Sequence, residues 1–287
     1  MKKNMKKIMV SVITLALALS MAGCGKAPET TGETTVAAEG GKKVLRVGME
    51  CGYAPYNWAQ PNDSNGAVPI ESSSDFAYGY DVIIAKYVAE QMGYDLQIQK
   101  LDWDSLPVAV QSGTIDCAIA GQSITKERME TVDFTNPYYF ASIVALTTKG
   151  SAYENAKSVK ELDGAVCTSQ LNTVWYDTCL PQIPNADIKP AMESAPSMLV
   201  ALDSGKVDLV VTDQPTALGA VAVYPDMQVL ELADGDFEVS EEEINIGISV
   251  KKGNKELLDA LNKALETLTP DDYTKMMNDA IKVSSGQ

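Results

Sequence analysis

The sequence predicts an α/β protein of two lobes, each with a largely parallel β-sheet. Segments with a strand pattern alternate with segments that have a helix pattern over residues 44–130, and a second such set covers residues 143–223. This alternation is typical of a parallel sheet covered by helices. The chain beyond residue 41 is also roughly 245 residues long, which is enough for two hydrophobic cores.

Two helices are predicted with particular end signals in the first set. The helix over 80–92 has Asp81 as its cap and Gly93 at its end. Asp104 opens a second helix, in which Pro107 stands in the first turn, where its missing N–H does no harm. The other elements predicted here are strands over 44–48, 95–100 and 114–120 and a short helix over 123–130.

The second set continues the alternation. Ser197 is predicted to cap a helix that Gly205 stops, and the helix over 254–268 carries its leucines on one stripe. The remaining predictions are strands over 143–148, 165–168, 207–211 and 244–250, an extended segment over 188–190, and helices over 158–162, 173–180, 214–223 and 270–281.

Residues 59–76 interrupt the pattern with many Pro, Asn, Asp, Ser and Gly residues, which predicts a long loop on the first lobe. A surface insertion is the favoured interpretation, and a lid or a partner-docking loop is the alternative. Asp63, Asn65 and Asp75 lack the full spacing of a calcium-binding loop.

The first residues predict a targeting segment. Four lysines precede an apolar stretch over 8–19, which is too short for a membrane-spanning helix and fits a secretory signal. The small residues before Cys24 resemble the lipobox of bacterial lipoproteins. The resemblance implies that residues 1–23 are a signal peptide and that Cys24 carries acyl chains such as palmitate. An ordinary secretory signal with an incidental cysteine is the alternative.

Residues 24–41 are rich in Thr, Glu, Ala and Gly and lack large apolar side chains. Such a segment cannot bury enough surface to offset the entropy of ordering, so we expect a flexible tether. The whole chain has a formal net charge of −16. This acidity argues against nucleic acid and anionic lipid as partners.

The remaining cysteines allow two interpretations. The chain has no histidine and no CxxC motif, so a zinc site is not expected, and no cofactor is predicted. The thiols could form up to two disulfides in an oxidising compartment, or they could be small core residues. These cysteines are Cys51, Cys117, Cys167 and Cys179.

Several sequence blocks resemble the amino-acid-binding proteins of ABC importers. The match covers nearly all of residues 42–281, and its specificity lies in the joint order and spacing of the blocks. In the first lobe these are 45–48 with 53–56, 79–81, 103–107, and 120–128 with 132–139; in the second they are 163–164, 170–173 and 210–215.

The resemblance implies a type II periplasmic-binding-protein fold with two hinge crossings. Lobe 1 would comprise residues 42–141 and 247–287, and lobe 2 residues 142–246, with hinges near 140–144 and 243–246. The implied mechanism is closure of the lobes on a ligand, followed by docking on a membrane permease.

A free amino acid is a zwitterion, so its site must satisfy a carboxylate and an ammonium together. Arg128 is the candidate for the carboxylate, because a guanidinium forms two parallel bonds to such a group. It follows a predicted strand-to-helix junction where Gly121 permits close approach and Ser123 and Thr125 offer further donors.

Asp213 stands just beyond an apolar predicted strand, where ligands of open α/β sheets bind. The resemblance gives it the ligand ammonium, a role that is compatible with capping the next helix. Thr173 would offer its hydroxyl and amide to the carboxylate from the opposite lobe. Asn172 replaces the usual Gly there, and Asn is the next-best residue for positive φ.

The side chain of the ligand is expected to meet aromatic rings and two polar groups. Tyr53, Trp58 and Trp103 are at or near positions where the resemblance places stacking rings. Glu50 follows the first strand, where a carboxylate suits a basic or amide side chain, and a solvated Glu50 is the alternative. Gln170 is a further candidate.

The sequence therefore predicts an extracytoplasmic protein that uses no cofactor. It is expected to capture a free amino acid, to pass it to a permease and to act as a monomer. A dehydratase of cyclic amino-acid precursors on the same fold would need a placed general acid or base. The chain has no histidine, and Arg128 and Asp213 already account for a zwitterion. An amino-acid sensor that addresses a receptor is the other alternative.

Overall fold

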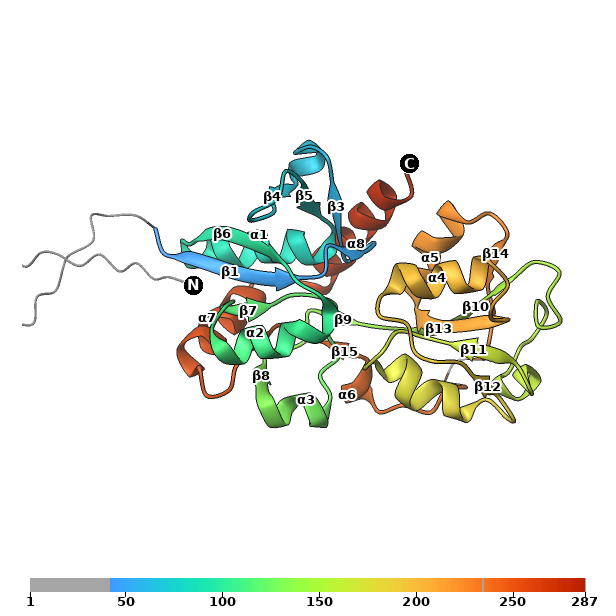
Figure 1. Cartoon of the computed structure of the whole chain (residues 1–287). Coiled ribbons are helices and arrows are strands. Elements are labelled where there is room, and N and C mark those ends of the chain that lie inside the picture. Colours follow the sequence, from blue (N-terminus) through green and yellow to red (C-terminus); the bar gives the residue numbers. More distant parts are fainter. Residues whose placement is uncertain (1–41, 234, 287) are drawn as a thin grey trace, which may run out of the picture. The chain divides into compact units, whose positions relative to one another are not determined.

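The computed structural model describes residues 42–233 and 235–286. Together these residues form two α/β lobes (Figure 1). The predicted signal peptide, Cys24 and the tether lie outside them. We use lobe 1 for the part of the chain around the sheet ordered β6-β1-β7-β16-β8 and lobe 2 for the part around the sheet ordered β12-β11-β13-β10-β14. The fold class predicted from the sequence is confirmed.

The sheet of lobe 1 is mixed. β6, β1 and β7 run parallel to one another, while β16 is antiparallel to both β7 and β8. The strands are β1 (Val44–Met49), β6 (Asp95–Lys100), β7 (Cys117–Ala118), β8 (Val132–Phe134) and β16 (Ser249–Lys251).

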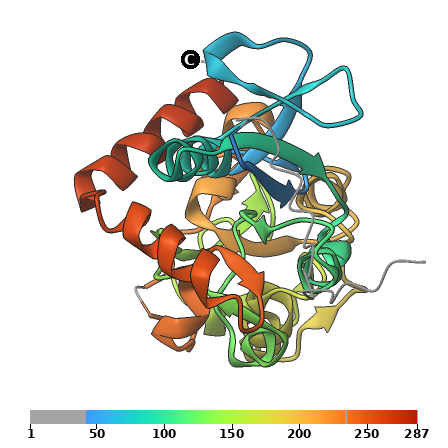
Figure 2. The same ribbon diagram turned by 90° about the vertical axis from the view of Figure 1, so that its left-hand side faces the viewer.

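Helices cover this sheet on both faces. α1 packs against α7 and α8, and Figure 2 shows these two late helices beside α1 on one side of the lobe. α7 has its leucine stripe facing inward, with Leu261 and Leu265 buried, as the periodicity predicts. The helices of lobe 1 are α1 (Tyr80–Met92), α2 (Leu106–Ser112), α3 (Lys126–Thr131), α7 (Lys255–Leu265) and α8 (Pro270–Ser284).

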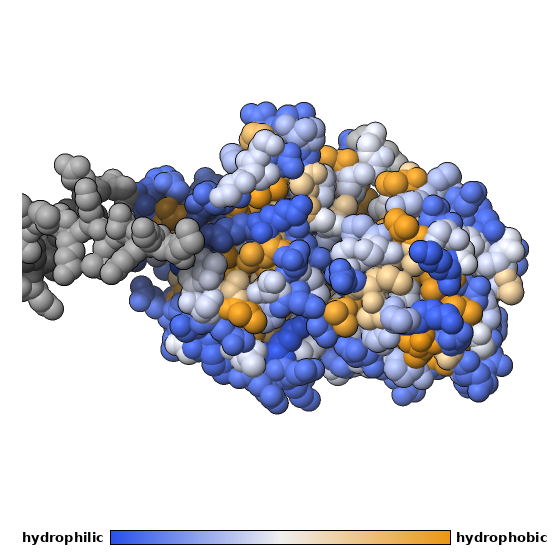
Figure 3. Space-filling model, viewed as in Figure 1, coloured by the Kyte–Doolittle hydropathy of each residue, from blue (hydrophilic) through white to orange (hydrophobic). Residues whose placement is uncertain are grey.

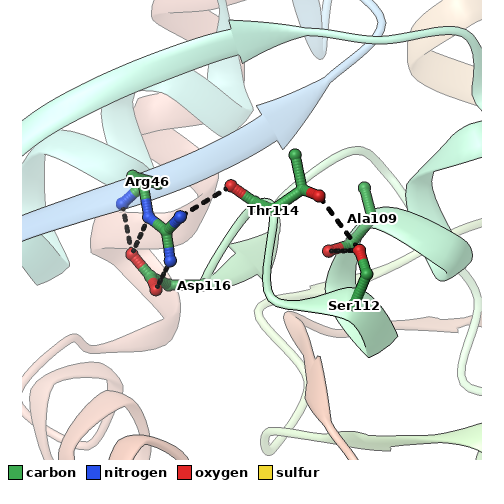
Figure 4. A network of polar contacts seen from close by, with 5 residues as sticks. All are labelled: Arg46, Ala109, Ser112, Thr114 and Asp116. Atoms are coloured by element: carbon green, nitrogen blue, oxygen red, sulfur yellow. Dashed lines mark hydrogen bonds and ion pairs between the residues drawn. The ribbon is translucent and has the colours of Figure 1, made fainter. Parts of the chain in front are cut away.

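An ion pair fastens β1 to the turn before β7 (Figure 4). Arg46 binds the carboxylate of Asp116 in two places, from Nε at 3.1 Å and from Nη2 at 2.6 Å, and it donates to the carbonyl oxygen of Thr114 at 2.9 Å. This forked geometry adds direction to the attraction. It fixes the start of the strand whose far end carries Glu50.

The sheet of lobe 2 repeats the mixed pattern. β12, β11 and β13 are parallel, while β10 is antiparallel to β13 and β14. The elements are β10 (Ile143–Thr148), β11 (Val166–Thr168), β12 (Asp187–Ile188), α4 (Ala195–Asp203), β13 (Leu209–Asp213), α5 (Gln214–Val223), β14 (Met227–Val229) and α6 (Glu241–Ile244).

The prediction of largely parallel sheets is confirmed, because four of the five strands in each sheet run the same way, and the connection between the lobes explains the two exceptions, β10 and β16. The chain crosses through a separate antiparallel pair, β9 (Tyr139–Phe140) and β15 (Asn245–Ile246). The parallel strands end toward the space between the lobes. β10 and β16 follow the crossings directly, so they enter their sheets from that side and run the opposite way.

The crossing also divides the predicted strand over 244–250. α6 ends at Ile244, β15 pairs with β9, and β16 pairs with β7 and β8. At the break, the amide of Gly247 donates to the carbonyl oxygen of Gln122 at 3.1 Å. The helix predicted over 123–130 therefore starts only at Lys126, since residues 122–124 are extended and bonded to this segment.

Two predicted helix caps are wrong. Gly79, not Asp81, precedes α1, and the Asp81 carboxylate accepts hydrogen bonds from Asn57 and Tyr138 instead. Ser194, not Ser197, caps α4, because α4 begins at Ala195. In both places a side chain suited to a cap stands inside the first turn.

The segment predicted as a long loop contains strands. β2 (Gly52–Tyr53), β3 (Asn57–Gln60), β4 (Val68–Pro69) and β5 (Phe76–Tyr78) form a sheet ordered β2-β3-β5-β4. Lys86 on α1 donates to the carbonyl oxygen of Gly66 at 2.6 Å, which ties this segment to α1.

The four cysteines of the body are free and buried, so the core-residue interpretation holds and the disulfide alternative does not.

Figure 3 shows a face that is mostly hydrophilic, with apolar residues in scattered patches. Within residues 42–233 and 235–286, no helix has the length and apolar character that crossing a membrane requires.

Candidate ligand-binding site between the two lobes

A small cavity lies where the ends of the parallel strands of the two lobes face each other. Its volume is about 10 Å³, which is close to the ~10–15 Å³ that one water molecule requires. It is lined from lobe 1 by Tyr53, Trp103, Gly121, Ser123 and Arg128, and from lobe 2 by Gln170, Thr173 and Trp175. Seven of these eight residues are among those that the sequence singles out.

A larger groove adjoins this cavity. Its volume is about 830 Å³, and Arg128 and Thr173 line both spaces. Glu127, Asp177 and Glu243 also line the groove, which gives it an acidic rim beside the Arg128 guanidinium.

Arg128 reaches from lobe 1 to lobe 2. It stands in the first turn of α3, where its amide donates to the Oγ1 of Thr125, the N-cap residue, at 3.2 Å. Its guanidinium donates to the carbonyl oxygen of Ser123 at 2.8 Å and to that of Asn172 at 2.6 Å. The group lies over the Trp103 ring, 5.3 Å from its centroid.

Burial lowers the pKa of Arg128 to about 10, so the guanidinium stays charged at neutral pH. The carbonyl oxygens that it contacts are neutral acceptors, and no carboxylate pairs with it among the described residues at salt-bridge distance. A ligand carboxylate at this point would therefore form a stronger, charge-assisted pair than the carbonyls do.

Gly121 is required by its backbone and by its neighbour. Its φ is +64°, and a Cβ at this position would lie 2.8 Å from Cε1 of Tyr53. Its amide donates to the hydroxyl oxygen of Tyr138 at 3.2 Å, and that hydroxyl donates to Asp81 at 2.7 Å. This buried network holds the segment before α3. Burial raises the pKa of Asp81 to about 6, although its hydrogen bonds oppose the shift.

Asp213 of lobe 2 does not line the cavity itself, but it contacts Tyr53, which does. It ends β13 and is the N-cap residue of α5, accepting from the Thr216 amide at 3.0 Å and from the Thr216 hydroxyl at 2.9 Å. It also accepts a hydrogen bond from the hydroxyl of Tyr53 in lobe 1. The residue is fully buried, and this burial raises the pKa of its carboxyl.

Glu50 and Gln170 meet across the lobes behind the cavity. Nε2 of Gln170 donates to the two carboxylate oxygens of Glu50 at 3.3 and 3.5 Å, and both residues are buried. Burial raises the pKa of Glu50 to about 7, and the charges of Asp81, Asp102 and Asp104 add to the shift. The alternative of a solvated Glu50 is therefore wrong.

The aromatic rings divide into two groups. Tyr53 and Trp103 line the cavity, and Trp103 donates from Nε1 to the carbonyl oxygen of Leu171 at 3.0 Å. Trp58 does not line it, because it lies on β3 and packs edge-on against Tyr78 with ring centroids 5.3 Å apart. Trp175 lines the cavity and was not predicted, although it stands two residues after Thr173 in an apolar stretch.

The Asn172–Thr173 corner has the geometry that the residue types indicate. Asn172 has a φ of +55°, the left-handed region that Asn tolerates. Its side chain donates to Asp104 of lobe 1 at 2.9 Å. Thr173 begins the helical turn that contains Trp175–Cys179, and its hydroxyl donates to the carbonyl oxygen of Gln170 at 2.6 Å.

This arrangement can bind a zwitterion. It offers a guanidinium and hydroxyl donors on one side, a buried carboxylate on the other, and two indole rings and a tyrosine ring between them. Among the described residues no three potential metal ligands cluster. Residues 45–281 match the model of the bacterial extracellular solute-binding proteins, family 3.

The chain belongs to this family. It is 26% identical over 265 residues to the arginine-binding extracellular protein ArtP of Bacillus subtilis, covering 92% of this chain and 93% of that protein. Among solved structures, it is similar to the amino acid ABC transporter substrate-binding protein AbpA of Streptococcus pneumoniae bound to L-arginine. The identity is 26%, the TM-score is 0.72, and the match covers 85% of this chain and 97% of the other.

An ancestral arginine-binding protein is similar in the same way. It has been solved bound to arginine and bound to glutamine, with 30% identity in both cases and TM-scores of 0.68 and 0.66. The matches cover 83% and 84% of this chain and 98% of the other chain in each case.

As a family 3 solute-binding protein, the molecule is an extracytoplasmic binding component of an ABC transporter and not an enzyme. The prediction that the chain is a transporter binding protein is therefore confirmed. The fold also accounts for the position of the site, since ligands of α/β sheets bind at the carboxyl ends of the parallel strands.

Proposed function

We propose that this protein captures a free amino acid with a basic or polar side chain, arginine first, and delivers it to the permease of an ABC importer. The single observation that carries the proposal is that Arg128 lines the cavity from lobe 1 while Asp213 of lobe 2 bonds to Tyr53, another residue of the cavity lining. The arginine and glutamine complexes of the similar proteins support the same ligand class.

The roles follow from charge. Arg128, with the Thr173 hydroxyl and the Ser123 and Thr125 groups, would bind the ligand carboxylate. Asp213 would accept the ligand ammonium, because an ammonium in a buried site needs a carboxylate partner. Glu50 and Gln170 would receive the far end of the side chain, with Tyr53, Trp103 and Trp175 packing along its stem.

Binding requires the site to enlarge. A cavity of about 10 Å³ does not hold an amino acid, so the lobes must move apart, with the crossings at β9 and β15 as the hinges. We place lobe 1 at residues 42–141 with 247–287 and lobe 2 at 142–246. The liganded, closed protein would then dock on the permease as a monomer; a receptor in place of the permease would make it a sensor.

A thermal-shift screen against the common amino acids tests this function. A ligand at about a hundred times its Kd stabilises the fold by about 2.7 kcal/mol, which gives an easily measured rise in Tm. We expect L-arginine to give the largest rise and L-glutamine a smaller one. If no amino acid raises Tm, before and after the protein is unfolded and refolded, the proposal is wrong.

The affinity for arginine should fall as the pH falls below about 7. Glu50 has a raised pKa of about 7, and a bound guanidinium beside it would favour its ionised form, so binding releases a proton where Glu50 is protonated. The loss approaches about tenfold per pH unit well below that pKa. Calorimetry in buffers of different ionisation enthalpy measures both the affinity and the proton release.

Two controls separate Glu50 from other titrating groups. Glutamine carries no charge on its side chain, so its affinity should change little over the same pH range. Glu50→Gln should remove the pH dependence of arginine binding and reduce the preference for arginine over glutamine. A pH dependence that survives in Glu50→Gln belongs to another group, such as Asp81.

We also propose that the chain is anchored by acyl groups on Cys24, after removal of residues 1–23, with 24–41 as the tether. Small residues before this cysteine support the proposal. Cys24→Ala should move the protein from the membrane fraction to the medium, and the mass of the wild-type amino-terminal peptide should include the lipid. An unmodified peptide would contradict the anchor.

A further inference from the structure

The groups assigned to the ligand are paired with one another across the cleft. The guanidinium of Arg128 donates to the carbonyl oxygen of Asn172, and Glu50 accepts from Gln170. The pair that bears most directly on the ammonium is Tyr53 and Asp213, which joins the first lobe to the second. Each contact occupies a group that the proposed function assigns to the ligand.

The Tyr53–Asp213 pair is buried. The exposed fraction is 7% for Tyr53 and 0% for Asp213. The other donors to Asp213 are the amide and hydroxyl of Thr216 and, at 3.5 Å, the hydroxyl of Thr212, all of which belong to its own lobe. The tyrosine hydroxyl is therefore the donor to Asp213 that comes from the opposite lobe.

We infer that the Tyr53 hydroxyl stands in for the ligand ammonium on Asp213 and is displaced when an amino acid binds. This inference rests on the proposed function, because it takes Asp213 as the ammonium acceptor. Tyr53 then has two separable roles: its ring packs along the ligand, and its hydroxyl competes with the ligand. In the ligand-free protein, the bond from this hydroxyl to Asp213 also links the two lobes.

The exchange has a definite direction. An ammonium is a charged donor and forms a stronger bond to a carboxylate than a phenol does, so the ligand ammonium displaces the Tyr53 hydroxyl from Asp213. The phenol bond must nevertheless break first, which lowers the net gain on binding. Removing the hydroxyl while keeping the ring should therefore tighten binding and weaken closure of the free protein.

Tyr56 supplies a matched control inside the same aromatic cluster. It stacks on Tyr53 with ring centroids 4.8 Å apart and an interplanar angle of 13°. Its hydroxyl is buried without a hydrogen-bond partner, so it contributes no bond between the lobes. Tyr53→Phe and Tyr56→Phe remove the same atom from adjacent rings, and only the first removes a contact to Asp213.

The experiment measures both variants beside the wild type. Small-angle scattering gives the radius of gyration without ligand, calorimetry gives the Kd for L-arginine, and thermal melts verify folding. Tyr53→Phe should enlarge the ligand-free radius and bind L-arginine about tenfold more tightly, a change of 1.4 kcal/mol. Tyr56→Phe should match the wild type in both measurements.

The outcomes separate this inference from the proposed function. Equal or weaker arginine binding by Tyr53→Phe overturns the displacement, because the hydroxyl would then stay in the complex. An unchanged ligand-free radius overturns the link between the lobes. If the wild type binds no amino acid, the proposed function fails, and an enlarged radius in Tyr53→Phe alone would still support the link.

Discussion

Arg128→Gln should raise the Kd for L-arginine by roughly a hundredfold to a thousandfold. Removing one member of a buried, hydrogen-bonded charge pair typically costs about 2–5 kcal/mol, and a ligand carboxylate would be left without its cation. Gln keeps a polar side chain and removes the buried charge, although it is too short to keep both contacts to the carbonyl oxygens of Ser123 and Asn172. The loss should therefore fall on binding more than on folding.

Lys126→Gln is the matched control for this prediction. Lys126 stands two residues earlier on α3, makes an exposed ion pair with Glu242, and has a side chain that is 84% exposed. Such pairs contribute little, so its affinity should stay within about twofold of the wild type. A calorimetric titration of both variants makes the comparison. Near-wild-type affinity in Arg128→Gln would remove the guanidinium from the site.

Loss of the guanidinium should also change the melting temperature. The same side chain joins the lobes through Asn172 and stacks on Trp103, so the ligand-free variant should melt slightly lower than the wild type. The rise in Tm with arginine should disappear in Arg128→Gln and persist in Lys126→Gln. The two readouts distinguish an unfolded variant from a folded one that cannot bind.

The helices that end in strong local signals were predicted well from the sequence. α1 ends at Gly93 and α2 at Gly113, both with positive φ, and α5 has the predicted bounds. Local chemistry decides these ends, because a left-handed glycine stops a helix whatever surrounds it. The caps at Asp81 and Ser197 failed because a buried network and an earlier serine compete with them.

The direction of the strands next to the crossings could not be predicted, for a different reason. β16 and β10 resemble ordinary apolar strands in sequence, and their antiparallel direction comes from the route of the chain between the lobes. Residues 59–76 form short strands only because they pair with one another at a distance. Partners far along the chain determine these elements, and no local pattern records them.

Some residues of the site could likewise be predicted from local sequence, and others could not. The sequence places Asp213 at a strand end and Gly121 and Arg128 at a strand-to-helix junction. Gly121 and Arg128 line the cavity, and Asp213 bonds to Tyr53, which also lines it. Trp175 was missed, because an aromatic residue in an apolar stretch resembles a core residue. The contact between Tyr53 and Asp213 depends on the approach of two lobes, and nothing in the spacing of 160 residues indicates it.

Asp213→Asn should also raise the Kd for L-arginine by roughly a hundredfold to a thousandfold, without loss of folding stability. The amide has the shape of the carboxylate but no charge, so the ligand ammonium would be buried without a counter-ion. Asn is as good a helix cap as Asp, so the bond from the Thr216 amide and the start of α5 should persist.

Asp208→Asn is a control of the same chemistry at the other end of the strand. Asp208 precedes β13 and accepts from the amide of Val166 at 2.9 Å, far along the strand from Asp213. It should keep the wild-type affinity and much of its stability, because an amide oxygen can also accept from the Val166 amide. Calorimetry should show a large loss of affinity in Asp213→Asn and none in Asp208→Asn if Asp213 is the ammonium acceptor.

The melting temperature of ligand-free Asp213→Asn carries the deciding information. Burial raises the pKa of Asp213, so its ionised form is costly in this environment and is tolerated for the sake of a cation that arrives with the ligand. A neutral amide relieves that cost, and the variant should melt at or above the wild-type temperature. If it instead melts well below the wild type and still binds arginine, Asp213 serves the fold rather than the ligand.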